Sequence, residues 1–133
     1  MRITKAIERW FKIPKDPDKA RVLVKHLRPG EVQDIIDQVM VQEIVYEQPE
    51  EGENPKGVLT QKNNRKMDRE KTILACVTNW ENFYDEEGKL MACDEANIMR
   101  AIKMIDGFTD FVGDCRKTLT EDVGNEMLAQ KKT

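Results

Sequence analysis

The residues best placed for chemistry lie in an acidic turn near the middle of the chain, the DEEG segment at residues 85–88. If its glycine took the sixth position of an EF-hand calcium loop, Asp85 and Glu87 would fall at the third and fifth positions and Asp94 at the twelfth. The first position would then be Phe83, which has no oxygen ligand, and the twelfth would be aspartate where a bidentate glutamate is needed. These two departures argue against a calcium site.

Other catalytic patterns are missing from the sequence. His26 is the only histidine, and the chain contains no serine that it could activate. The cysteines Cys76, Cys93 and Cys115 are odd in number and far apart, a pattern typical of reduced structural thiols. No phosphate-binding loop, dinucleotide fingerprint or H-E-x-x-H motif is present. We therefore expect no enzyme activity, no cofactor and no metal.

The charge and hydropathy of the chain exclude further classes. Charged residues make up 35% of the sequence, and the net charge is −3, so no strong basic field exists to hold a nucleic acid. No apolar run approaches the roughly 18 residues that span a bilayer, and no apolar block typical of a signal peptide follows the first residues. We expect a cytoplasmic protein of one domain, residues 1–133, that contacts neither nucleic acid nor membrane.

The first half of the chain predicts strands, one helix and a loop. Residues 21–27 are rich in β-branched side chains and form the best predicted strand, whereas residues 3–13 fit either a helical face or a short strand. The remaining expectations are a helix at 31–42, extended structure at 44–46, a mobile loop at 48–57 and a short strand at 58–60 that returns to the sheet.

The second half predicts three helices. Ile73, Val77 and Trp80 are spaced as one helical stripe, and a hairpin-like turn around Gly88 follows. Asp94 is a suitable N-cap for the next helix, Gly107 separates it from the last helix, and residues 126–133 are expected to fray. The sequence therefore predicts an α+β fold, a small antiparallel sheet from the first half packed by several helices.

Two segments resemble small tail proteins of tailed bacteriophages and prophages, most closely the tail assembly chaperone family. Residues 79–102, NWENFYDEEGKLMACDEANIMRAI, match a helix end, an acidic turn, an apolar pair and a capped helix. The matching positions are Trp80, Phe83, Asp85, Glu86, Gly88, Lys89, Leu90, Asp94, Asn97 and Ile98. Residues 10–35 resemble the amino-terminal half of the same proteins, although residues 91–93 depart from the proline and phenylalanine common after the turn.

The resemblance implies a protein that holds the tape-measure protein while tail subunits polymerise around it. Exposed methionines suit such a task because they adapt to irregular partners, although each could instead be an ordinary core residue. The candidate partner-binding residues are Trp80, Phe83, Tyr84, Met91, Met99, Met104 and Met127. The alternative is a structural tail component, such as a tube, terminator or adaptor subunit, and a homo-oligomer remains open.

Overall fold

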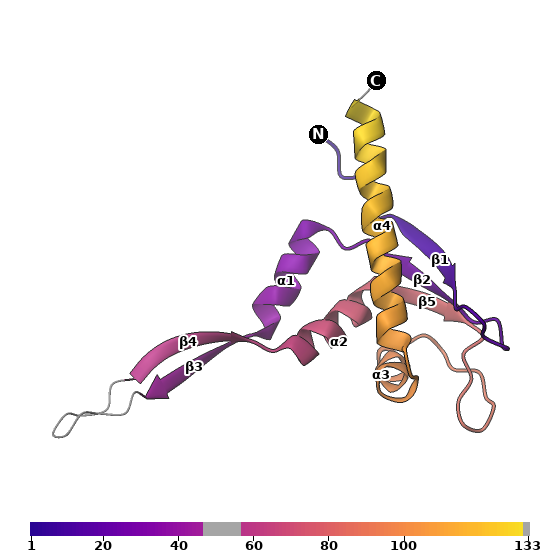
Figure 1. Ribbon diagram of the computed structural model, residues 1–133, viewed down its shortest axis with the longest axis horizontal. Helices are drawn as coiled ribbons and strands as arrows, with labels where there is room; N and C mark the ends of the chain where they lie inside the picture. Colours follow the sequence, from indigo (N-terminus) through magenta and orange to yellow (C-terminus); the bar gives the residue numbers. More distant parts are fainter. Residues whose placement is uncertain (47–56, 132–133) are drawn as a thin grey trace.

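The computed structural model describes the backbone of residues 1–46 and 57–131 and the side chains of residues 1–40 and 64–125. Within these residues helices cover one face of a three-stranded antiparallel sheet, and a two-stranded ribbon extends away from this body (Figure 1). The α+β fold class predicted from the sequence is confirmed.

The sheet has the strand order β1-β2-β5, with β1 at Glu8–Lys12, β2 at Arg21–Lys25 and β5 at Val77–Glu81. In the central strand Val22 and Val24 are fully buried while the residues between and beside them are partly exposed, as expected when side chains alternate between the faces of a sheet. The ambiguous segment at residues 3–13 therefore supplies a strand, because β1 pairs with β2 in regular antiparallel register.

The helical stripe predicted for Ile73, Val77 and Trp80 is wrong beyond Cys76. The helix α2 (Arg65–Cys76) ends there, and β5 joins the sheet by pairing with β2. A register shift between Leu23 and Val24 leaves an extra residue in β5, and such a bulge lets Val77 and Trp80 both face the core although they are three positions apart. The bulge therefore gives the buried residues of β5 the spacing that is typical of a helix. As a result, the sheet contains a strand from the second half of the chain that was not predicted.

The two-stranded ribbon is inserted between two helices. The helix α1 (Pro29–Val39) leads directly into β3 (Met40–Tyr46), which pairs with β4 (Gly57–Asn63) along its whole length. The amide of Asn64 donates to the carbonyl of Val39 over 3.3 Å and closes the base. Figure 1 shows the ribbon as an arm that leaves the body of the molecule.

Two predictions for this region change, and a third falls almost entirely outside the described residues. The predicted helix at 31–42 ends at Val39, because the chain enters β3 at once. The strand predicted at 58–60 pairs with β3 and does not return to the main sheet. Of the mobile loop predicted at 48–57, residues 48–56 lie outside the described residues, and Gly57 begins β4.

The last two helices begin and end close to their predicted positions. Asp94 caps α3 (Glu95–Met104) by accepting from the amide of Asn97 over 2.8 Å, and Gly107 separates α3 from α4 with a φ of +78°. α4 (Phe108–Lys131) crosses the sheet (Figure 1) and remains helical through residues 126–131, where fraying was predicted. Residues 132–133 lie outside the described part of the chain.

The core lies between the sheet and the helices. Its centre is aromatic: the rings of Trp80 and Phe83 stack with centroids 4.2 Å apart, and Phe108 meets both edge to face. The other buried members of the core are aliphatic side chains and two cysteines: Ala20, Val22, Val24, Leu27, Ile35, Ile73, Cys76, Val77, Ile98, Ala101, Val112, Cys115 and Leu119.

Candidate functional site

Trp80 and Phe83, two of the predicted partner-binding residues, lie inside the core. Their exposed fractions are 5% and 4%, and the indole Nε1 of Trp80 donates to the backbone carbonyl of Met91 over 2.8 Å. Both the faces and the polar edge of the indole are thus used within the molecule. The prediction that these two side chains contact a partner directly is corrected; they support the segment that follows them.

The acidic turn is held by its own backbone and carboxylates. Asp85 Oδ1 accepts from the amides of Glu87 and Lys89, each over 2.9 Å, and Gly88 takes the positive φ of +77° that the turn requires. Glu86 Oε1 accepts from Arg100 Nη2 over 2.6 Å, which ties the turn to α3. The carboxylates of Asp85 and Glu86 therefore stabilise the shape of the turn, and both already have hydrogen-bond partners within the protein.

An exposed apolar surface lies beside this turn, and we call it the turn–α3 patch. Its members are Tyr84, Leu90, Met104 and Ile105, with exposed fractions of 46%, 68%, 63% and 40%. Tyr84 and Leu90 face each other in an isolated antiparallel bridge. A hollow of about 260 Å³ opens between the turn and α3 and includes Tyr84, Met104 and Ile105 in its lining.

The other predicted contact residues divide between core and surface. Met91 is half-buried, packs against the core and lines the hollow. Met99 on α3 is also half-buried, and the side chain of Met127 lies outside the described residues. The structure therefore gathers Tyr84, Met91 and Met104 in one place and leaves Met99 apart from the lining of the hollow.

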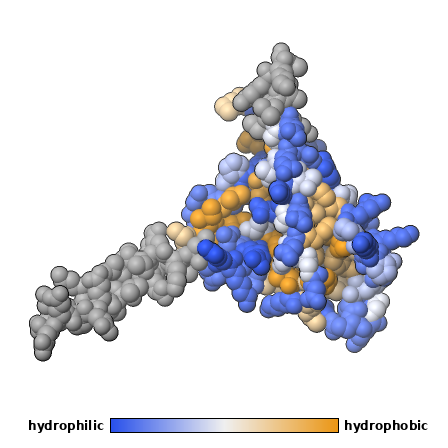
Figure 2. Space-filling view, in the orientation of Figure 1, coloured by the Kyte–Doolittle hydropathy of each residue, from blue (hydrophilic) through white to orange (hydrophobic). Residues whose placement is uncertain are grey.

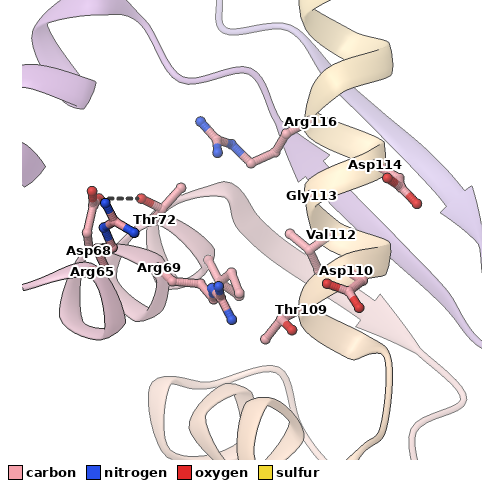
Figure 3. Close-up of a pocket in the computed structure, with 11 residues that line it drawn as sticks. Arg65, Asp68, Arg69, Thr72, Thr109, Asp110, Val112, Gly113, Asp114 and Arg116 are labelled. Carbon is pink, nitrogen blue, oxygen red and sulfur yellow. Dashed lines mark hydrogen bonds between the residues drawn. The ribbon is translucent and has the colours of Figure 1, made fainter.

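A larger groove of about 530 Å³ runs between α2 and α4, and we call it the α2–α4 groove (Figure 3). Its lining is mostly polar, over a floor that includes the buried Ile73 and Val112. The lining residues are Arg65, Asp68, Arg69, Thr72, Ile73, Thr109, Asp110, Val112, Gly113, Asp114 and Arg116. In Figure 2 hydrophobic residues are visible on both sides of the α4 ridge, bordered by hydrophilic ones.

Sequence reasoning missed this groove. In the sequence alone, the basic run at residues 62–69 indicates only a solvated helix start, and Gly113 only a weak point within a helix. The signal that was available is the spacing of Arg65 and Arg69, one helical turn apart on one side of α2. This spacing indicates one side of a groove only when α4 is known to form the other side.

The three cysteines are thiols held in their neutral form. Burial raises the pKa of Cys76 to about 11 and that of Cys115 to about 12, and it also raises the pKa of Cys93. A neutral buried thiol is a poor nucleophile. Among the described side chains, no group of three or more histidine, cysteine or acidic residues is arranged to hold a metal ion.

Comparison with protein families, with characterised proteins and with solved structures finds no match to this chain. None of the described helices has the length and hydrophobicity needed to cross a bilayer.

Proposed function

We propose that the chain is a tail assembly chaperone of a tailed bacteriophage or prophage. It binds the tape-measure protein in the host cytoplasm while tail subunits assemble, and it acts by binding, without catalysis. The support from sequence is the resemblance carried by residues 79–102 and 10–35.

The observation that carries this proposal is the turn–α3 patch. Leu90 and Met104 are more than half exposed. Met104 lines the hollow together with Tyr84, the bridge partner of Leu90, and contiguous exposed apolar surface marks an interaction site. The patch stands on a rigid base, because the Trp80 indole holds Met91 and the Arg100 guanidinium holds the turn. A methionine at its edge can adapt to the irregular apolar surface of a long helical partner.

A structural tail component is the second candidate, and the ribbon favours it. β3 and β4 form a sheet of two strands, so within the described residues each strand has one edge without a backbone partner. Such an edge can accept a strand from a neighbouring subunit. Repeated head-to-tail contacts of this kind close into rings, the form in which tube and terminator subunits would assemble.

Mass spectrometry of purified particles against the lysate separates the two candidates. A chaperone is abundant in lysate and absent from particles, whereas a structural subunit is present in particles at a fixed ratio to other tail proteins. The second result would make the chaperone proposal wrong.

Co-purification with the tape-measure protein of the same phage or prophage tests the patch. The double variant Leu90→Asp/Met104→Asp is expected to retain at least roughly tenfold less tape-measure protein, because it places two charges in the contact surface. The matched control is Ile3→Asp, which changes an exposed apolar residue in the amino-terminal segment; Figure 1 places that terminus at the opposite end of α4 from α3. Equal retention by both variants would remove the patch from the proposal.

A further inference from the structure

The α2–α4 groove has an ordered distribution of charge. Arg65 and Arg69 are four residues apart on α2, and Asp110 and Asp114 are four residues apart on α4. Residues at this spacing lie one above the other on a helix surface. These pairs give α2 a basic row and α4 an acidic row, although Asp68 of α2 and Arg116 of α4 also line the groove.

The arginines of the groove are not engaged inside the described part of the molecule. The ion pairs between described side chains involve other residues, and neither Arg65, Arg69 nor Arg116 forms one. Asp68, in contrast, accepts from the Thr72 hydroxyl over 3.3 Å. In Figure 3 the Arg69 side chain extends from α2 toward Thr109 of α4. With respect to the described side chains, the guanidinium groups of Arg65 and Arg69 on α2 and of Arg116 on α4 therefore remain available to carboxylates of a partner.

Gly113 lies on the groove side of α4, one turn beyond Thr109. A Cβ at this position would meet no atom within 4 Å, so no close contact within the molecule requires a glycine. A glycine inside a helix costs about 1 kcal/mol relative to alanine. What the glycine does provide is a shallow helix surface on which another backbone can approach closely.

We propose that the α2–α4 groove seats an α-helix of the partner protein. A third helix fits between two helices that form the walls of a groove, because its side-chain ridges can enter it. The charge order defines the occupant: a helix with a small residue facing Gly113, carboxylates facing Arg65 and Arg69, and basic residues facing Asp110 and Asp114. This inference rests on the proposed function, since it assigns a helix of the tape-measure protein to this groove.

The test fills the groove without disturbing the fold. Gly113→Leu is compared with Gly124→Leu, because both glycines are exposed positions of α4 and a Cβ at either meets nothing within 4 Å. Gly124 is not part of the groove lining. Both variants are expected to unfold in urea at or above the midpoint of the unmodified chain, since leucine is the better helix former. In co-purification, the amount of tape-measure protein retained is expected to fall at least roughly tenfold for Gly113→Leu and less than about twofold for Gly124→Leu.

A charge reversal tests the basic side separately. Arg69→Glu is expected to reduce retention of the tape-measure protein at least roughly fivefold, because it places like charges against each other. The control is Lys66→Glu, an identical change of charge on α2 at a residue outside the groove lining. Equal losses in the two variants would show a diffuse electrostatic effect and overturn the assigned contact.

The outcomes separate this inference from the proposed function. If the unmodified chain retains the tape-measure protein and Gly113→Leu retains it equally, the groove is not the seat of the helix and the proposed function stands. If the unmodified chain retains none, both fail. If sedimentation shows self-association that Gly113→Leu abolishes, the occupant is a second copy of this chain and the assignment to the tape-measure protein is wrong.

Discussion

The indole Nε1 of Trp80 donates a hydrogen bond of 2.8 Å to the backbone carbonyl of Met91. Trp80 lies in β5 and Met91 follows the acidic turn, so the bond joins the sheet to the segment that leads into α3. The amide of Met91 also donates to the carbonyl of Phe83 over 2.8 Å. The turn–α3 patch is therefore positioned by a core residue that is itself almost fully buried.

Trp80→Phe is expected to lower the free energy of unfolding by about 1–3 kcal/mol, because it leaves the Met91 carbonyl without its donor and the core with a smaller ring. The control is Trp10→Phe. Trp10 is half-buried, and its ring carries the Arg21 guanidinium 4.3 Å from the centroid, a contact that phenylalanine can still make at a cost below about 1 kcal/mol. Urea unfolding followed by far-ultraviolet circular dichroism measures both; equal losses would mean that the Trp80 hydrogen bond has no special part.

Local features of the fold could be predicted from the sequence, and features made by distant segments could not. The acidic turn, the Asp94 cap and the break at Gly107 each depend on residues within a few positions of one another, and all three were predicted correctly. The strand identity of Val77 to Glu81 was missed because a bulge against β2, more than 50 positions earlier, gives its buried residues a helical spacing.

The candidate sites follow the same rule. The sequence selected Trp80 along with Tyr84 and Met104 as contact residues, and only the packing shows that Trp80 is internal while the other two are exposed. The α2–α4 groove is lined by residues of both α2 and α4, and no pattern within either helix shows that the two lie on opposite sides of one groove. The ribbon departs from this rule: extended structure at 44–46 and a strand at 58–60 were both predicted, and only their pairing in a sheet of their own was missed.

Lys19 has a φ of +57°, a left-handed conformation that is unfavourable for a lysine. Asparagine tolerates this conformation better, so Lys19→Asn is expected to raise the free energy of unfolding by about 0.5 kcal/mol. Lys12→Asn, the same substitution in β1, is expected to lower it, because asparagine is a poor strand former. If the urea midpoints of both variants shifted in the same direction from that of the unmodified chain, the explanation from backbone conformation would be contradicted.

Gly107→Ala is expected to destabilise the protein by about 1–2 kcal/mol, because the φ of +78° between α3 and α4 is strained for a residue with a Cβ. Gly30→Ala is the matched control: it lies in the first turn of α1, its φ is not positive, and a Cβ there meets nothing within 4 Å. That change is expected to be neutral or stabilising by up to about 1 kcal/mol. Thermal unfolding of the pair in parallel checks the difference in sign.

The thiols should differ in their rates of modification. Cys93 is half-buried, whereas burial raises the pKa of Cys76 to about 11 and of Cys115 to about 12. The pKa of Cys93 is also raised, but its thiol is the most accessible of the three, so Cys93 is expected to react with Ellman's reagent at pH 8 faster than the other two. Peptide mapping should place the fast site at Cys93, and all three should react together in urea. A fast reaction at Cys76 would contradict its position in the core.

Glu31 should contribute to stability in a pH-dependent way. Its carboxylate accepts from Lys25 Nζ over 2.7 Å and from the Arg28 amide over 3.2 Å, and the Lys25 hydrogen bond is the main cause of the lowered pKa of Glu31. Since the folded pKa lies below the unfolded one, the contribution is present in full above the ordinary glutamate pKa of about 4.3 and is lost as the pH falls through the folded pKa.

Glu31→Gln is therefore expected to unfold at lower urea concentration than the unmodified chain at pH 6 and to show a flatter decline between about pH 5 and pH 3. Lys25→Met removes the same contact from the other side and should flatten the decline similarly, because Lys25 is the first cause of the lowered pKa of Glu31. The size of the effect is small, since both side chains are partly solvent-exposed. If the stability of Glu31→Gln fell as steeply between about pH 5 and pH 3 as that of the unmodified chain, other carboxylates would be responsible for the loss of stability in acid.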